Sequence, residues 1–155
     1  MVLGPERFTE QAQEVLNSSQ MVLNRYRHNQ WDCEHILMAL LEQEKGVPAE
    51  ILSELGVNVD NLHARLHSLL ETVTRAEGLQ AQIYQTPRLG DLFLRAEAEA
   101  GRFNDEFIGT EHILVALTQE EHGESSDVLA EFGVETEAVY RALHKVRGGH
   151  RITDQ

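Results

Sequence analysis

Apolar positions along this chain recur with helical spacing, and no segment alternates as a half-buried strand does. The first helix is predicted at about 9–27, where an i, i+3, i+4, i+7 stripe comprises Ala12, Val15, Leu16, Ser19, Val22 and Leu23. The next segment, about 33–43, is apolar nearly all round, as in a central buried helix. A short third helix is predicted at about 48–55 and a fourth at about 59–74, separated by Gly56 as a helix stop. The pattern predicts an all-α fold without strands.

This series of elements occurs twice. Glu34-His35-Ile36-Leu37 returns as Glu111-His112-Ile113-Leu114, displaced by 77 positions, and this displacement gives 16 identities between residues 9 and 70 without a gap. One register held for that long indicates an internal duplication. Because a domain of about 70 residues is only marginally stable alone, we expect the two halves to pack together. The prediction is a pseudo-twofold bundle of eight helices, with repeat 1 at about 8–74, a linker at about 75–85 and repeat 2 at about 86–147.

Composition narrows the partners. The chain has 155 residues, 41% of them apolar, and a net charge of −13. An acidic surface argues against nucleic acid, whose phosphates favour clustered Lys and Arg. No apolar run approaches the ~20 residues that span a membrane, and the first residues lack the features of a signal peptide. We therefore expect a cytoplasmic location, with no membrane and no nucleic-acid partner.

Motifs of catalysis are absent from the sequence. It contains no phosphate-binding glycine loop, no nucleophile elbow and no HExxH. The single cysteine, Cys33, corresponds to Thr110 in repeat 2, which favours a capping or packing role over a nucleophilic one. His63 and His67 have the i, i+4 spacing of zinc ligands, but His63 corresponds to Tyr140, so we expect no metal site. The sequence predicts a non-catalytic domain.

The repeated Glu-His pair is the main polar signal. Glu34 and Glu111 fall in the first turn of a helix, where the helix dipole stabilises a carboxylate. His35 lies off the stripe formed by its apolar neighbours and is expected to bond a neighbouring loop. Thr9 is a candidate N-cap, as is Thr86, which is followed by proline. A purely structural role and a site for a guanidinium together with an anion both remain open.

These motifs resemble those of the Clp N-terminal domain. The resemblance rests on Phe8-Thr9 opening a helix, on the run from Gly109 to Leu114, and on the Gly-Val turn that occurs in both repeats, at Gly56-Val57 and Gly133-Val134. It covers about residues 5–147, so that 1–148 would be one domain. Residues 149–155 resemble the start of the linker toward the ATPase module of ClpB-type disaggregases, which favours a ClpB-type over a ClpC-type parent.

The resemblance implies a function in protein quality control and the stress response. Such a domain recognises unfolded or aggregated polypeptides, or adaptor proteins, and delivers them to the ring of an AAA+ unfoldase. The segment itself would carry no cofactor and be monomeric, whereas the parent would be a hexamer that uses ATP and Mg²⁺. A free-standing accessory protein that regulates a Clp machine is the alternative. Where the halves meet, an apolar groove is expected, with Phe8, Leu16 and Leu94 as candidate lining residues.

ClpC-type domains add a second alternative, because some bind phosphoarginine at two symmetry-related sites. The resemblance then implies Thr9 with Glu34 at one site and Thr86 with Glu111 at the other. Carboxylates would pair with the guanidinium, while helix-start amides and threonine hydroxyls would bind the phosphoryl group. Repeat 1 departs from the family pattern, because Asp32-Cys33 stand where repeat 2 has Gly109-Thr110. In repeat 2, Pro87 removes one amide donor.

Overall fold

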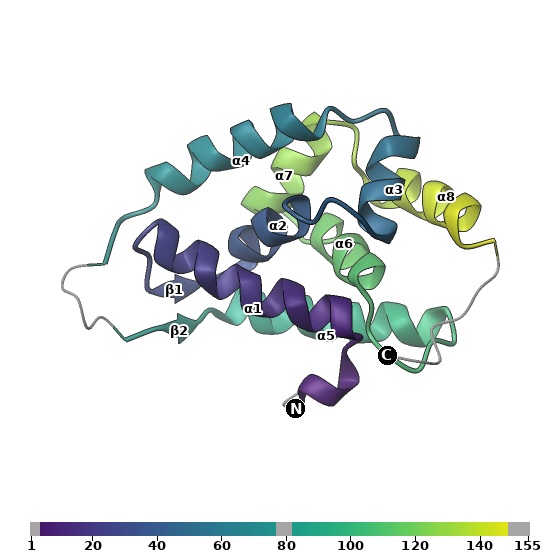
Figure 1. Cartoon of the computed structure of the whole chain (residues 1–155), viewed down its shortest axis with the longest axis horizontal. Helices are drawn as coiled ribbons and strands as arrows, with labels where there is room; N and C mark the ends of the chain where they lie inside the picture. Colours follow the sequence, from purple (N-terminus) through teal and green to yellow (C-terminus); the bar gives the residue numbers. More distant parts are fainter. Residues whose placement is uncertain (1–3, 77–81, 149–155) are drawn as a thin grey trace.

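The chain folds into a bundle of α-helices, seen in a computed structural model that describes residues 4–76 and 82–148 (Figure 1). Within the described part, eight α-helices confirm the predicted all-α class. Repeat 1 opens with a short 3₁₀ helix, Pro5–Arg7, followed by α1 Glu10–Arg25, α2 Cys33–Leu41, α3 Val47–Glu54 and α4 Val59–Thr72. Repeat 2 contains α5 Pro87–Arg102, α6 Thr110–Thr118, α7 Glu124–Glu131 and α8 Thr136–Arg147. The expected linker segment 149–155 lies outside the described residues.

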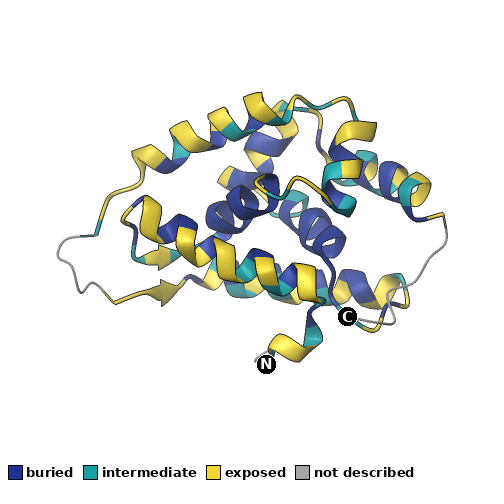
Figure 2. Cartoon of the chain, viewed as in Figure 1, coloured by how far each residue is buried: buried dark blue, intermediate teal, exposed yellow. Residues whose placement is uncertain are grey.

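The duplication is visible in the helix boundaries. The first three helices of each repeat begin and end at positions 77 residues apart. In both repeats the second helix, α2 or α6, is buried along nearly its whole length and lies at the centre of the bundle (Figure 2). These two helices contact each other, so the repeats share one apolar core.

Helix starts follow the sequence signals. Thr9 caps α1 by accepting a hydrogen bond from the amide of Ala12, and Thr86 caps α5 in the same way from Leu89. Asp32 caps α2 by accepting from the amide of Cys33. Repeat 2 has a glycine at the equivalent position, so α6 begins without a side-chain cap.

The prediction of no strands is wrong at two dipeptides. β1 Gln30–Trp31 pairs in parallel with β2 Tyr84–Gln85, and Phe8 forms a similar isolated bridge with Ile108. Strands of two residues are too short to show an alternating pattern, so periodicity could not mark them. Each pairing joins the connector before a central helix to the segment before the first helix of the other repeat. The two repeats are therefore cross-connected.

In repeat 1 a pair of buried histidines ties the start of α2 to the end of α1. The amide of Asp32 donates to His35 Nδ1 at 3.0 Å, so His35 Nε2 carries the hydrogen and donates to His28 Nδ1 at 2.9 Å. His28 in turn bonds the backbone of Leu70 at the end of α4. Each ring uses one donor and one acceptor, so this His28–His35 pair is formed by two neutral imidazoles.

Repeat 2 places a carboxylate where repeat 1 has His28. The amide of Gly109 donates to His112 Nδ1 at 2.8 Å, and His112 Nε2 donates to Asp105 Oδ2 at 2.7 Å. Two further hydrogen bonds of 2.8 and 2.7 Å join the Arg147 guanidinium to Asp105. Both histidines of the Glu-His motif are thus buried and bond a loop as expected. Their position off the apolar stripe did not reveal this burial, because α2 and α6 are covered on every side.

Candidate functional site

A single arginine joins the two repeats near the start of α2. Arg88, in the first turn of α5, donates to Glu34 at 2.9 and 3.1 Å, to Glu120 at 2.7 and 2.8 Å, and to Asp32 at 3.0 Å. Five hydrogen bonds use every N–H of the guanidinium. We refer to Arg88, Asp32, Glu34 and Glu120 as the arginine cluster.

Two hydroxyl groups complete the arginine cluster. Thr86 Oγ1 donates to Asp32 Oδ1 at 2.8 Å, and Ser125 Oγ donates to Glu34 Oε2 at 2.6 Å. Glu34 is only 5% exposed. The hydrogen bonds that Arg88 donates lower the pKa of Glu120, and the acceptance of these bonds by Glu120 and Glu34 raises the pKa of Arg88 despite its partial burial. Three carboxylates around one cation leave an excess of negative charge.

The structure groups the four candidate residues differently from the expectation, which paired Thr9 with Glu34 and Thr86 with Glu111. Thr86, rather than Thr9, lies beside the start of α2, because its amide donates to the carbonyl of Trp31. The amide of Thr9 instead donates to the carbonyl of Ile108. Thr9 therefore lies beside the start of α6, the helix that contains Glu111. The cross-connection of the repeats produces this exchange, which helical periodicity could not reveal. Each candidate site therefore takes its threonine and its glutamate from different repeats.

The Glu111 site has the glutamate without an arginine. Glu111 corresponds to Glu34 and is 4% exposed, yet no residue of 4–76 and 82–148 forms a hydrogen bond or ion pair with its carboxylate. Every fully buried side-chain oxygen in these ranges has a hydrogen-bond partner. Because the carboxylate oxygens of Glu111 have none there, they must be partly exposed. At the position equivalent to Arg88 stands Gln11, which is exposed.

The three candidate groove residues differ in exposure. Phe8 is 2% exposed and packs its ring against Phe93 at a centroid distance of 5.9 Å. It belongs to the core, so an open groove lined by Phe8 is not present in this structure. Leu16 is half-buried against the same core, whereas Leu94 on α5 is 43% exposed. The half-buried rings of Trp31 and Phe93 also contact each other, at 6.1 Å.

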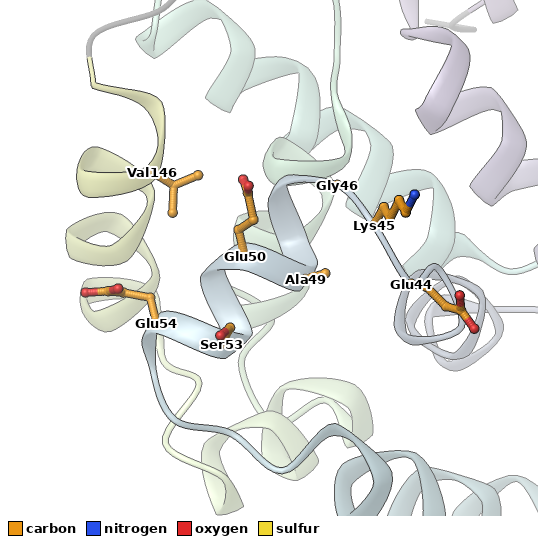
Figure 3. Close-up of a pocket in the computed structure, with 8 residues that line it drawn as sticks. All are labelled: Glu44, Lys45, Gly46, Ala49, Glu50, Ser53, Glu54 and Val146. Carbon is orange, nitrogen blue, oxygen red and sulfur yellow. The ribbon is translucent and has the colours of Figure 1, made fainter.

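Two of the hollows in the described part of the chain have no lining residue in common with Glu111 or its neighbours in sequence. One, of about 340 Å³, lies beside the arginine cluster and is lined by the His28–His35 pair, by Asp32 and Glu34, and by the end of α4. The other, of about 740 Å³, lies between α3 and α8 (Figure 3). Figure 3 shows Glu50 and Val146 facing each other across this second hollow, with Glu54 at its edge. Glu54 is already paired with Lys145 at 3.0 Å, and the lining is polar surface without a buried ionisable group.

The remaining candidates have ordinary structural roles. His63 bonds Glu42 at 2.9 Å and His67 bonds the hydroxyl of Tyr26 at 2.5 Å, so they do not converge on one point. No cluster of three or more potential metal ligands occurs in the described ranges. Cys33 is buried, which raises the pKa of its thiol. Over the same residues, no helix has the length and apolar character needed to cross a bilayer.

Sequence reasoning missed the arginine cluster. Arg88, Glu120 and Ser125 gave no motif, because each lies far in sequence from Glu34. The repeat did contain a signal, since positions equivalent to Arg88 and Glu120 hold the neutral Gln11 and Gln43. A cation and an anion that both replace glutamines suggest an ion pair, but only the cross-connection shows where it forms.

Comparison with known proteins decides the family. The model of the Clp repeat N-terminal domain matches residues 7–145. The chain belongs to this family. A ClpB chaperone of Mesorhizobium japonicum is 31% identical over 144 residues, covering 93% of this chain and 17% of the relative. A ClpB chaperone of Parasynechococcus marenigrum is 33% identical over 150 residues, covering 97% and 17%. This Clp N-terminal domain thus spans less than a fifth of these relatives.

Solved structures share the fold. The Hsp104 N-terminal domain from Candida albicans superposes with a TM-score of 0.82 at 17% identity, covering 95% of each chain. A ClpV N-domain in complex with a VipB peptide superposes with a TM-score of 0.64 at 17% identity, covering 96% of this chain and 91% of the other. At these identities the likeness concerns the fold alone. The Clp N-terminal domain is a non-catalytic domain, and the ClpB relatives are AAA+ ATPases.

Proposed function

We propose that this Clp N-terminal domain recognises unfolded or aggregated polypeptides, or adaptor proteins, for an ATP-dependent ClpB- or ClpC-type unfoldase. The observation that carries the proposal is membership of the Clp N-terminal domain family, and a ClpV N-domain of the same fold is found with a bound peptide. The parent chain is then an ATPase that uses ATP and Mg²⁺ in the cytoplasm and pulls the captured segment into its ring.

Exposed apolar surface on α5 supports this proposal. Leu94 is exposed on α5, next in sequence to Phe93, whose ring packs against those of Phe8 and Trp31. Leu16, the repeat equivalent of Phe93, is also half-buried. A partly exposed apolar surface suits flexible apolar segments of varied sequence, because their side chains are recognised by burial rather than by directed hydrogen bonds.

A substitution on α5 tests this surface. Leu94→Asp places a charge where an apolar client segment would pack, and we expect binding of an unfolded model protein to weaken about tenfold, or roughly 1.4 kcal/mol. Amide shifts of the labelled domain, followed during titration with the client, measure this loss and map the contact surface.

Val73→Asp provides the matched control. Val73 follows α4 and is 38% exposed, against 43% for Leu94, so the two substitutions remove similar exposed apolar area and add the same charge. Equal weakening by both variants would indicate a nonspecific charge effect. Scattered shifts in the unsubstituted domain would contradict a defined client surface.

Recognition of phosphoarginine is a second candidate function, and it is favoured by the contrast between Glu34 and Glu111. Arg88 demonstrates that a guanidinium fits against the glutamate of repeat 1. Glu111 is the corresponding carboxylate, nearly buried and without a hydrogen-bond or ion-pair partner in the described ranges. Thr9 and the first turn of α1 lie beside the segment that enters α6, where they would supply donors for a phosphoryl group.

Calorimetric titration with phosphoarginine tests this candidate. We expect saturable binding that Glu111→Gln weakens at least tenfold, because the amide retains the shape of the carboxylate but cannot pair with a cation. Glu121→Gln is a control of equal charge change on an exposed residue. Binding that persists in Glu111→Gln would exclude this residue as the receptor.

The free-standing accessory protein remains the alternative to a domain of a large ATPase. The two differ in what the full reading frame encodes after this domain. A Walker A motif downstream of Gln155 is expected for the unfoldase, and a frame that closes without one would favour the accessory protein.

A further inference from the structure

We propose that Arg88 is a built-in occupant of the first guanidinium site and restricts external guanidinium ligands to the Glu111 site. The inference rests on the second candidate function above, because it assumes that Glu111 receives a guanidinium. It assigns Arg88 a role in specificity, since this one side chain makes two equivalent sites functionally unequal.

The geometry of the arginine cluster supports full occupancy. Every N–H of Arg88 is used, and both oxygens of Glu34 accept from it. Ser125 donates to the same Glu34 carboxylate, so few acceptor positions remain for another cation. An external arginine could bind Glu34 only after Arg88 had left.

Covalent attachment strengthens this competition. Arg88 belongs to the same chain as Glu34, so its effective concentration at the carboxylates is far above that of a dissolved ligand, on the order of millimolar or higher. Its aliphatic stem is also partly buried, since the side chain is 35% exposed. A free guanidinium compound would have to compete against both advantages.

Comparison of the repeats identifies the substitutions that create this difference. Repeat 1 has Asp32 where repeat 2 has Gly109, and the other two members of the arginine cluster, Arg88 and Glu120, correspond to Gln11 and Gln43. Every charged member of the arginine cluster except Glu34 therefore has a neutral residue at the position 77 residues away in the other repeat. The glutamate, Glu34 at the first site and Glu111 at the second, is the charged residue that both sites have.

The test converts the first site into a copy of the second. The variant Asp32→Gly, Arg88→Gln, Glu120→Gln removes the arginine without leaving its carboxylate partners Asp32 and Glu120 behind. Phosphoarginine is titrated by calorimetry, with arginine in a parallel titration to separate guanidinium from phosphoryl recognition. We expect the stoichiometry to rise from one to two, and the added site to disappear when Glu34→Gln is included.

A reciprocal variant guards against a change that merely perturbs the fold. Gln11→Arg, Gln43→Glu, Gly109→Asp recreates the arginine cluster around Glu111, and we expect phosphoarginine binding to fall at least tenfold. Retained helical circular dichroism and cooperative unfolding are required of both variants. A matched double variant, Gln43→Glu with Gly109→Asp, keeps Gln11 and lacks the introduced arginine. Stronger binding by this double variant than by the triple variant would show that the arginine itself blocks the site, and equal binding would contradict this role.

The outcomes separate the inference from the function on which it rests. One site in the unsubstituted domain and still one site in the first variant would overturn the inference and leave the Glu111 site standing. Two sites in the unsubstituted domain would also overturn it, because Arg88 would then block nothing. Absence of binding in both proteins would overturn the inference together with phosphoarginine recognition.

Discussion

The two repeats fix the start of their central helices with the same histidine and different partners. In repeat 1, His35 bonds His28, and the pair contains no charge in the state that its hydrogen bonds require. In repeat 2, His112 bonds Asp105, which is also held by Arg147 from the last turn of α8. Burial lowers the pKa of His28, His35 and His112 alike. One histidine geometry is therefore compatible with two electrostatic environments.

The difference shows how a duplicated fold can divide its stability between two kinds of interaction. A neutral imidazole pair costs little to bury but loses its hydrogen bonds when either ring is protonated. A buried carboxylate is costly to desolvate, and it is stable only while Arg147 and His112 both remain in place. Loss of a partner should therefore affect repeat 2 most, whereas acidification should affect repeat 1 more, because Asp105 partly offsets the lowering of the pKa of His112 by burial.

The largest expected effect comes from removing the carboxylate of repeat 2. Asp105→Ala leaves the nearly buried Arg147 without its bidentate partner, and we expect a loss of about 3–5 kcal/mol in the free energy of unfolding. The equivalent His28→Ala removes a neutral partner from His35 and should cost about 1–3 kcal/mol. Urea unfolding of both variants measures the two losses. An equal or larger loss for His28→Ala would contradict the comparison.

Acidification should act most strongly on repeat 1. The pKa of His35 is lowered to about 4, mainly by burial and then by the neighbouring His28. An unfolded histidine has a pKa near 6.5, so the unfolded state binds more protons below that pH. The stability due to neutral His35 is complete above about pH 6.5 and falls as the pH drops toward 4. We expect a loss of about 2 kcal/mol from His35 between about pH 7.5 and about pH 5.

His28→Asp sharpens the pH comparison. This substitution gives His35 the type of partner that His112 has, and the carboxylate raises the pKa of His35 toward its unfolded value. The loss of stability between about pH 7.5 and about pH 5 should therefore shrink, although the variant is less stable at neutral pH because Leu70 stands where repeat 2 has Arg147. Urea midpoints at the two pH values test this, and an unchanged difference would exclude His35 as the titrating group.

The smallest expected effect concerns the helix caps. Thr9 and Thr86 both accept a hydrogen bond from the first turn of their helix, but Thr86 also donates to Asp32 in the arginine cluster. We expect Thr9→Ala to cost about 1 kcal/mol and Thr86→Ala up to about 2 kcal/mol. Thermal or urea unfolding distinguishes them, and Thr→Ser at each position should restore most of the loss.

Local signals predicted the helices well because they depend on neighbouring residues. The caps at Thr9 and Thr86 and the apolar segments of α2 and α6 lie within single helices or next to them. The arginine cluster was not predicted, because it joins Asp32, Arg88 and Glu120 across three separate segments. The grouping of Thr86 with Glu34's helix also depends on how the repeats cross. No periodic pattern encodes that crossing.

The cross-pairing of the connectors also has a consequence for how such a fold can be assembled. Phe8 pairs with Ile108, and the equivalent β1 pairs with β2, so each repeat completes the other through the same set of contacts. A single repeat would satisfy them by pairing with a second copy in a two-fold symmetric dimer. Joining the copies into one chain makes that association intramolecular and independent of concentration. It also allows each copy to evolve alone, which is the condition under which one site could acquire Arg88 while the other kept Gln11.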